Sequence, residues 1–103
     1  MEKITDNSYK DLIKNTERLI IKFEADWCAP CRMVSPILEE ISINYGEKVK
    51  VVSCNVDENP KCAYDYNIRN IPTVLFFKMG ELKNRHIGVV PKKTYEIEIN
   101  KLL

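Results

Sequence analysis

Two cysteines separated by only two residues lie between an apolar run and a helical pattern in this 103-residue chain. Before them, residues 18–25 are rich in branched and aromatic side chains and predict a strand. After them, apolar residues recur at helical spacing as far as Tyr45, and Gly46 ends the pattern. The pair, Cys28 and Cys31, is therefore expected at a strand-to-helix turn, where it could bind a metal, staple the fold or exchange electrons.

The rest of the chain continues the alternation of strand and helix patterns. In chain order we expect an extended start at 1–4, a helix from a cap at Asp6 or Asn7 to about Asn15, the strand at 18–25, a helix at 31–45 bent by Pro36, a strand at 48–56, a short helix within 57–66, two antiparallel strands around a turn at 79–81, and a helix at 92–103. The apolar faces of the two long helices should consist of Met33, Val34, Ile37, Leu38, Ile41 and Ile43, and of Tyr95, Ile99, Leu102 and Leu103. This order predicts an α/β fold with a mixed sheet covered by helices on both faces.

Composition and charge narrow the class of protein. Hydrophobic residues make up 45% of the chain, which suits one globular domain over residues 1–103. Sixteen Lys and Arg balance fifteen Asp and Glu without a block of like charge, which argues against nucleic acid or a membrane surface as a partner. The polar N-terminus lacks a secretory pattern, and no apolar run is long enough for a membrane span. We expect a monomer in the cytoplasm, where permanent disulfides are disfavoured.

A metal site and a structural staple both fit the cysteine pair poorly. A structural zinc site needs four ligands, and the remaining candidates are Cys54, Cys62 and His86. Seven residues separate Cys54 from Cys62, whereas the second half of a zinc site usually has about two to four. A disulfide that closes a loop of two residues removes little chain entropy, so it stabilises a fold weakly. We therefore expect neither a metal nor a cofactor.

The positions of Cys28 and Cys31 favour the third possibility, electron exchange. At the start of a helix, the Cys28 sulfur faces free backbone N–H groups and the positive end of the helix dipole, which favour the thiolate. Thiolate is the species that attacks a disulfide. Cys31 lies one turn further along the same helix, within reach of Cys28, and Pro30 restricts the turn between them. The first cysteine is thus expected to attack a substrate disulfide and the second to resolve the mixed disulfide.

Several motifs surround this pair in a familiar order. The segments "ADWCAPCRMVSPILEEI", "VDENP", "YNIRNIPTVLFFKMGE" and "HIGVV" resemble the thioredoxin family, and the similarity runs from about Ile4 to Leu103. The resemblance implies the thioredoxin fold, with a central mixed sheet flanked on both faces by about four helices. It also implies a thiol–disulfide oxidoreductase that reduces disulfide bonds in other proteins and is re-reduced by a thioredoxin reductase. The alternative is a binding or chaperone-like module on the same fold, with slow redox chemistry.

The resemblance assigns roles to matching positions. Cys28 matches the nucleophile and Cys31 the resolving thiol, while Pro72 matches a cis-proline beside which a substrate strand pairs. The residues that match the family's flat docking surface for partner proteins are Trp27, Ala29, Pro30, Ile71, Pro72, Gly88 and Val89. Taken singly, Trp27 could instead be a core aromatic, Pro72 an ordinary strand-start proline and Gly88 a plain turn.

The sequence departs from the family beside the cysteine pair. Lys22 stands where the family has a buried aspartate that accepts a proton from the resolving thiol, and Ser53 stands where it tends to have a lysine. Glu24 is two residues from Lys22, on the same face of the strand, so the two side chains can form a replacement pair that tunes the thiols or transfers the proton. Otherwise Lys22 points its ammonium to solvent, or burial leaves it neutral and able to accept the proton from Cys31.

Three further positions remain open. Asn70 replaces a glycine before the "IPT" motif, which asparagine can do by adopting a left-handed backbone. Cys54 is expected in the core, and Cys62, in the first turn of a short helix, is either another core residue or a second reactive thiol. His86 has no partner at a suggestive spacing, so we expect a surface or strand role for it.

Overall fold

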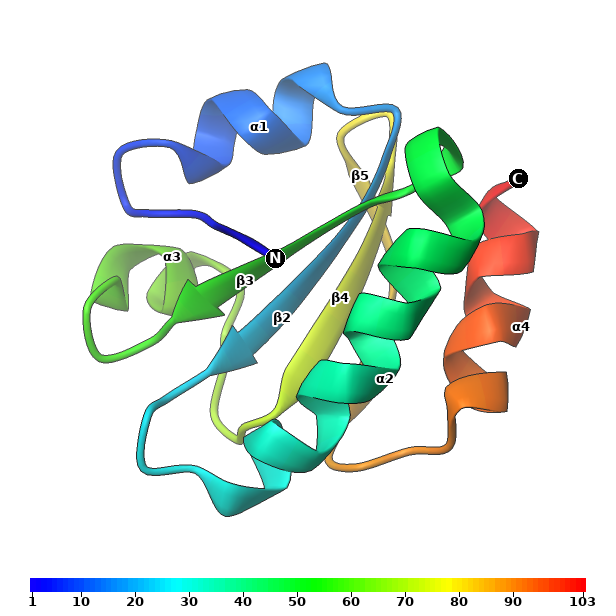
Figure 1. The fold of residues 1–103 in the computed structure, drawn as a ribbon. Coiled ribbons are helices and arrows are strands. Elements are labelled where there is room, and N and C mark those ends of the chain that lie inside the picture. Colours follow the sequence, from blue (N-terminus) through cyan, green and yellow to red (C-terminus); the bar gives the residue numbers. More distant parts are fainter.

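The computed structural model describes residues 1–103 and contains a five-stranded sheet with four α-helices (Figure 1). In chain order the elements are β1 (Glu2–Lys3), α1 (Tyr9–Asn15), β2 (Arg18–Glu24), α2 (Ala29–Tyr45), a 3₁₀ turn (Gly46–Lys48), β3 (Lys50–Asn55), α3 (Pro60–Asp65), β4 (Thr73–Lys78), β5 (Glu81–Ile87) and α4 (Lys92–Leu102). The strands lie in the order β1-β3-β2-β4-β5, with the first three parallel and β4 and β5 antiparallel to their neighbours. The predicted α/β order and the mixed sheet are confirmed.

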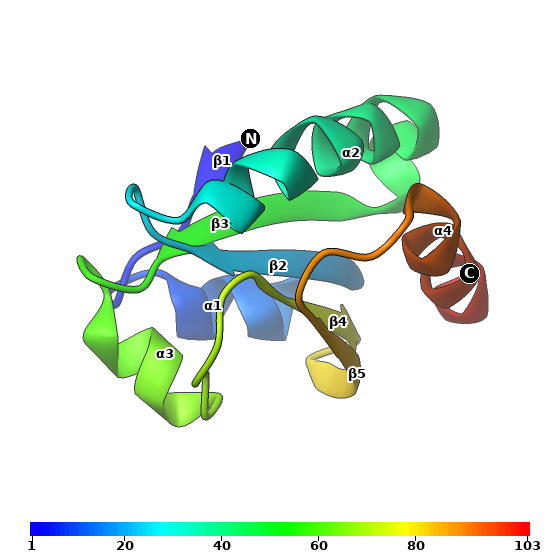
Figure 2. The ribbon, with the colours of Figure 1, turned by 90° about the horizontal axis from the view of Figure 1, so that it is seen from below.

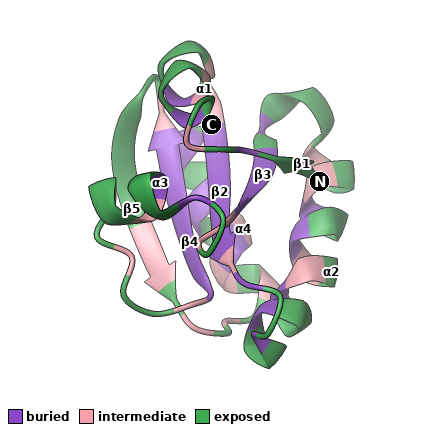
Figure 3. Ribbon diagram, turned by 90° about the vertical axis from the view of Figure 1, so that its left-hand side faces the viewer, coloured by how far each residue is buried: buried purple, intermediate pink, exposed green.

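Helices cover both faces of the sheet, as Figure 2 shows when the sheet is seen edge-on. Helices α1 and α3 pack on one face, and α2 and α4 pack on the other. Successive residues of a strand point to opposite faces, so β2 supplies both cores. Leu19, Ile21 and Phe23 face α1 and α3, whereas Ile20 faces α2 and α4. The central strands are therefore buried on both sides, in contrast to the exposed edge strand β5 (Figure 3).

The two long helices bury a narrower stripe than their apolar residues suggest. Helix α2 buries Cys31, Val34, Leu38 and Ile41. The expectation that Met33 and Ile43 belong to this stripe is wrong: these side chains are 62% and 80% exposed. On α4, Leu103 is likewise exposed, while Tyr95, Ile99 and Leu102 are buried as expected. A helix that packs on a flat sheet contacts it along one line of residues, so apolar side chains beside that line remain in solvent.

The start of α1 differs from the predicted cap. The helix begins after Ser8, and no side chain caps it. The Asp6 carboxylate instead accepts hydrogen bonds from the backbone N–H groups of Lys61 and Cys62, at 3.2 and 2.8 Å. These N–H groups belong to the first turn of α3, which has no internal partners for them. Asp6 therefore stabilises the start of a helix more than fifty residues away and joins the two helices of that face.

Candidate active site

The two cysteines lie where β2 ends and α2 begins. Cys28 is the N-cap residue of α2, and its sulfur accepts a hydrogen bond from the backbone N–H of Cys31 at 3.2 Å. Cys28 and Cys31 form a disulfide, with their Cα atoms 5.3 Å apart. The same N–H that satisfies the helix terminus therefore points at the sulfur that would carry a negative charge once the disulfide opens. The predicted position of the pair at a strand-to-helix turn is confirmed.

Exposure alone does not distinguish the two sulfurs. Cys28 is 3% exposed and Cys31 is 1% exposed, and both pack with Ala25, Val56 and Ile71. What separates them is hydrogen bonding, because only the Cys28 sulfur receives a backbone N–H of the helix. This asymmetry favours Cys28 as the thiolate and leaves Cys31 without a backbone donor at its sulfur.

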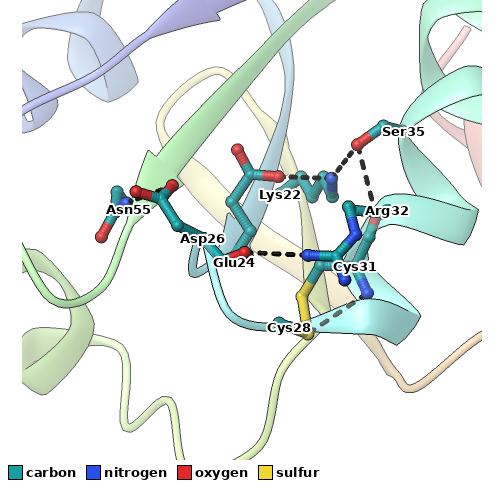
Figure 4. A network of polar contacts seen from close by, with 8 residues as sticks. All are labelled: Lys22, Glu24, Asp26, Cys28, Cys31, Arg32, Ser35 and Asn55. Atoms are coloured by element: carbon teal, nitrogen blue, oxygen red, sulfur yellow. Dashed lines mark hydrogen bonds and ion pairs between the residues drawn. A yellow bond between two sulfur atoms is a disulfide. The ribbon is translucent and has the colours of Figure 1, made fainter.

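A buried ion pair lies beside Cys31, on the face of β2 that supports α2 (Figure 4). The Lys22 side chain is 1% exposed, and its ammonium donates to a carboxylate oxygen of Glu24 and to the hydroxyl of Ser35. Ser35 donates in turn to the backbone carbonyl of Cys31 at 3.3 Å. The predicted pairing of Lys22 with Glu24 is confirmed, and the alternative that Lys22 points to solvent is wrong.

Ser35 was not among the residues singled out from the sequence. It lies four residues after Cys31, so a helix places the two on one face, which is the only local signal that could have identified it. Its contact with Lys22 depends on how α2 crosses β2. The neighbour of Lys22 on β3 is Ser53, which is also buried, so the strand beside it supplies no second charge.

Trp27 lies on the surface, next to the cysteine pair. Its side chain is 69% exposed, which overturns the reading of this residue as a core aromatic. The indole N–H donates to a carboxylate oxygen of Asp57 at 2.9 Å, and this bond fixes one edge of the ring. The turn that carries Trp27 is held by Arg32, whose guanidinium donates to the carbonyl of Asp26 at 2.8 Å. The ring is thus an exposed apolar surface with a fixed orientation.

Two further loops meet at the same end of the sheet. The Ile71–Pro72 peptide bond is cis, as the resemblance implied, and Ile71 packs against the two cysteines. The N–H of Gly88 donates to the carbonyl of Pro72 at 2.8 Å, so the segment after β5 is joined to the segment before β4. Gly88 has φ +86°, which favours glycine, and the neighbouring Val89 side chain is 45% exposed. The loop forms with Asn70 in place of the glycine, and Asn70 does not need a left-handed backbone there, because the left-handed residue of this loop is Asn67.

The other two cysteines lie elsewhere in the molecule. Cys54 on β3 and Cys62 on α3 are free thiols, both fully buried in the core that faces α1 and α3. A hydrogen bond with Cys54, together with burial, raises the pKa of the Cys62 thiol, so this thiol stays protonated at neutral pH. Cys54 is a core residue, as expected, and the same burial argues against Cys62 as a second reactive thiol.

The remaining candidates are not at the cysteine pair. His86 lies on β5, with a ring nitrogen 3.4 Å from a carboxylate oxygen of Glu98 and its ring edge-on to Phe76 and Tyr95. This placement agrees with a strand role for His86. The structure contains no group of three or more His, Cys, Asp or Glu side chains arranged to hold a metal ion. None of its helices combines the length and apolar character needed to cross a membrane.

A disulfide that closes a loop of two residues at a helix N-terminus, with a cis-proline on the same mixed α/β fold, is typical of a class of thiol–disulfide exchange proteins. The family model "Thioredoxin" matches residues 1–101. A thioredoxin from Pyropia yezoensis is 44% identical over the whole chain and 97% of its own length, and a chloroplastic M-type thioredoxin from Pisum sativum is 42% identical over the whole chain and 60% of its own length. The oxidised mitochondrial thioredoxin 3 of Saccharomyces cerevisiae superposes with a TM-score of 0.90 at 33% identity, over 98% of this chain and 94% of that protein.

The chain belongs to the thioredoxin family. It is a thiol–disulfide oxidoreductase, and Cys28 and Cys31 are its redox-active pair. The expected thioredoxin fold is confirmed, and no feature of the fold or the site favours the alternative of a binding module with slow redox chemistry.

Proposed function

We propose that this chain reduces disulfides in other proteins, with Cys28 as the attacking thiol and Cys31 as the resolving one. The observation that carries the assignment is the hydrogen bond of 3.2 Å from the Cys31 N–H to the Cys28 sulfur. A donor at this position stabilises negative charge on Cys28 and offers nothing comparable to Cys31. Cys28 is therefore the thiolate in the reduced protein.

The reaction has two exchange steps, each of which forms one sulfur–sulfur bond and breaks another. In the first, the Cys28 thiolate attacks a substrate disulfide, forms a mixed disulfide and releases one substrate thiolate. In the second, Cys31 loses its proton and attacks the Cys28 sulfur. This closes the Cys28–Cys31 disulfide and releases the second substrate thiolate. Two electrons pass from the protein to the substrate, and a thioredoxin reductase returns them.

Lys22 and Glu24 take part in the removal of the proton from the Cys31 thiol, which precedes its attack on Cys28. Their ion pair lies beneath the helix turn that carries Cys31 (Figure 4). The ammonium favours a thiolate on this turn, and the Glu24 carboxylate, with its side chain 26% exposed, can pass a proton to water. The pair thus takes the place that the family's buried aspartate occupies in its relatives.

Protein substrates dock on the apolar surface around the disulfide. Three segments form it: the turn before α2, the loop that ends at the cis-proline, and the segment after β5. The proposed contact residues are Trp27, Ala29, Pro30, Ile71, Pro72, Gly88 and Val89. Backbone groups beside Pro72 are available to pair with an extended substrate segment, in the manner of a strand added to a sheet.

We further propose that the protein acts as a monomer in the cytoplasm. Its free thiols at Cys54 and Cys62 suit a reducing compartment. Sedimentation of the purified protein measures its mass, and fractionation of the cells that express it locates it. A dimer, or recovery from an organelle such as the chloroplast of its M-type relatives, would contradict this part of the proposal.

The central test is reduction of insulin disulfides with dithiothreitol as the electron source. The wild-type protein should accelerate precipitation of the insulin B chain, and the directional assignment is tested by trapping. Cys31→Ser should accumulate mixed disulfides with proteins, because nothing resolves them, whereas Cys28→Ser should trap few. Equal trapping by both variants contradicts the assignment of Cys28, and a wild-type protein without insulin activity contradicts the proposed function.

A further inference from the structure

Ser35 joins the buried cation of β2 to the helix turn that carries Cys31. Its hydroxyl accepts a hydrogen bond from the Lys22 ammonium and donates one to the Cys31 carbonyl at 3.3 Å (Figure 4). The hydroxyl is thus used as both acceptor and donor, and the two bonds lead from a charged side chain to the backbone of a redox cysteine. Ser35 is half-buried, so bulk water does not freely replace either contact.

The two partners of Lys22 hold its ammonium from different elements. Glu24 lies on the same strand as Lys22, and its side chain is 26% exposed. Ser35 lies on α2, and it alone among the hydrogen-bond partners of Lys22 belongs to the helix. If the Ser35 hydroxyl is removed, the ion pair on the strand remains, and the ammonium is no longer held against the helix.

The backbone of α2 has a weak point at the same place. Pro36 follows Ser35 inside the helix and has no N–H, so the carbonyl four residues earlier, that of Arg32, lacks its usual donor. A serine that donates back to the carbonyl four residues earlier competes with the helix's own bonding, and such residues accompany helix bends. The Ser35 bond and Pro36 therefore both alter the regular bonding of α2 next to the turn that carries Cys31.

The geometry points to Ser35 as a positioning residue of the thiol–disulfide reaction: it holds the Lys22 ammonium against the turn of α2 that carries Cys31. In that position the cation stabilises thiolate, and therefore the reduced form of the pair, so the disulfide becomes a stronger oxidant. This inference deepens the proposed function, because it rests on the role given there to Lys22 and Glu24. It adds a residue that touches neither sulfur with its side chain.

The test is equilibration of each variant with glutathione, in which the protein disulfide and two glutathione thiols exchange for the protein dithiol and one glutathione disulfide. Ser35→Ala should shift this equilibrium toward the protein disulfide, roughly two- to tenfold, as expected for the loss of one ordinary hydrogen bond. The thiolate absorbance of the reduced protein should also rise at a higher pH than in the wild type. The glutathione equilibrium and the thiolate titration both depend on the charge near the cysteine pair. Neither would shift if Ser35 had a merely structural role.

Matched variants separate the hydroxyl from the space it fills. Ser35→Thr keeps the hydroxyl, and a helical threonine can still bond the carbonyl four residues earlier, so it should behave as the wild type. Ser35→Val has nearly the same shape as Ser35→Thr without the hydroxyl and should behave as Ser35→Ala. Ser42→Ala removes a half-buried hydroxyl from the same helix, two turns away from Ser35, and should leave the equilibrium unchanged.

A double substitution shows whether Ser35 acts through Lys22. In a Lys22→Met background, Ser35→Ala should produce no further shift, because the cation it positions is gone. An equal shift in both backgrounds overturns the proposal, as does an equilibrium that Ser35→Ala and Ser35→Val leave unchanged. Insulin reduction by the wild-type protein is scored separately. The glutathione equilibrium still reports on Ser35 if that activity is absent.

Discussion

The molecule contains two pairs of cysteines that are equally buried and chemically different. Cys28 and Cys31, at 3% and 1% exposed, form a disulfide at the start of α2. Cys54 and Cys62, both at 0%, are free thiols between β3 and α3. Burial raises the pKa of any thiol, so burial alone would make all four inert. The difference must come from what each sulfur faces.

The active pair faces polar backbone, whereas the core pair faces apolar side chains. At Cys28 an N–H of a helix terminus donates to the sulfur, and the Ser35 hydroxyl links the buried Lys22 ammonium to the carbonyl of Cys31. Cys62 has its backbone N–H satisfied by Asp6. Its thiol is hydrogen-bonded with Cys54, and the Asp6 and Asp65 carboxylates disfavour a thiolate there. A helix N-terminus is therefore not enough to activate a thiol, because Cys62 also lies in the first turn of a helix. The sulfur must receive the free N–H itself.

The largest effect expected from this comparison is on insulin reduction. Cys28→Ala and Cys31→Ala should each reduce the rate to the dithiothreitol background, because each step of the exchange needs its own sulfur. Cys54→Ala and Cys62→Ala remove thiols that are fully buried and out of reach of a substrate, so both should keep the rate within about twofold of the wild type. The effect is measured as the initial rate of insulin reduction at equal concentrations of folded protein.

The contrast between the two cysteine pairs is wrong if Cys54→Ala or Cys62→Ala loses activity while it remains folded. Thermal unfolding monitored by circular dichroism serves as the control for each variant. Removal of a buried sulfur creates a small cavity, and a cost of about 1 kcal/mol in stability is expected without loss of rate. A folded Cys62→Ala protein with background activity would mean that the second pair takes part in the reaction.

Much of this arrangement could be predicted from the sequence, because it depends on local spacing. A strand places every second residue on one face, so the pairing of Lys22 with Glu24 followed from their separation. The position of Cys28 at a helix N-terminus followed from an apolar run next to a helical pattern. These features require only the two periods of strand and helix.

The features that could not be predicted join segments that are distant in the chain. The contact of Ser35 with Lys22 depends on the way α2 crosses β2, and the bonds from α3 to Asp6 span more than fifty residues. The exposure of Met33 and Ile43 likewise depends on where the helix touches the sheet. Such relations are set by packing between layers, which residue spacing within one element does not specify.

A smaller effect should sharpen the contrast between the two pairs by changing the charges beside only one of them. Lys22→Met removes a buried cation and leaves the Glu24 carboxylate, which disfavours thiolate, so the reduction potential should become more negative. Glu24→Gln removes the anion and leaves the ammonium, so the potential should become less negative. A unit charge about 7 Å away is worth at most about 2.4 kcal/mol at an effective dielectric near 20, or about 50 mV for a two-electron couple.

The decisive result is that Lys22→Met and Glu24→Gln shift the reduction potential in opposite directions. Equilibration with glutathione measures both potentials, and alkylation of Cys54 and Cys62 in the folded proteins serves as the control that the core pair is unaffected. Shifts of the same sign would show that both variants act through lost packing. No shift in either would show that the ion pair holds the structure together without tuning the thiols.

The smallest expected effect concerns the pH dependence of stability, and it comes from the core pair. The pKa of Cys62 is raised in the folded protein, by the hydrogen bond with Cys54 and by burial, whereas an unfolded cysteine ionises near pH 8.5. At Cys62 the unfolded state therefore loses a proton that the folded state keeps. The same hydrogen bond lowers the pKa of Cys54, which changes stability in the opposite direction, below about pH 8.5 and not above it. The contribution of Cys62 to stability is complete below about pH 8.5 and decreases as the pH rises above it, by at most about 1.4 kcal/mol per pH unit for one thiol.

Urea unfolding of the oxidised protein between about pH 8 and 10 measures this slope, since the disulfide cysteines do not titrate. Tyr9, Tyr66 and Tyr95 also have raised pKa values in the folded protein, that of Tyr95 to about 12 by burial, and they lower stability in the same direction as the pH approaches 10, where unfolded tyrosines ionise. The slope that belongs to Cys62 is therefore taken below about pH 9.5. Cys62→Ala should flatten the slope, whatever its stability at neutral pH. An unchanged slope would show that the Cys62 thiol ionises as readily in the folded core as in the unfolded chain, and the contrast between the two cysteine pairs would then not rest on their protonation.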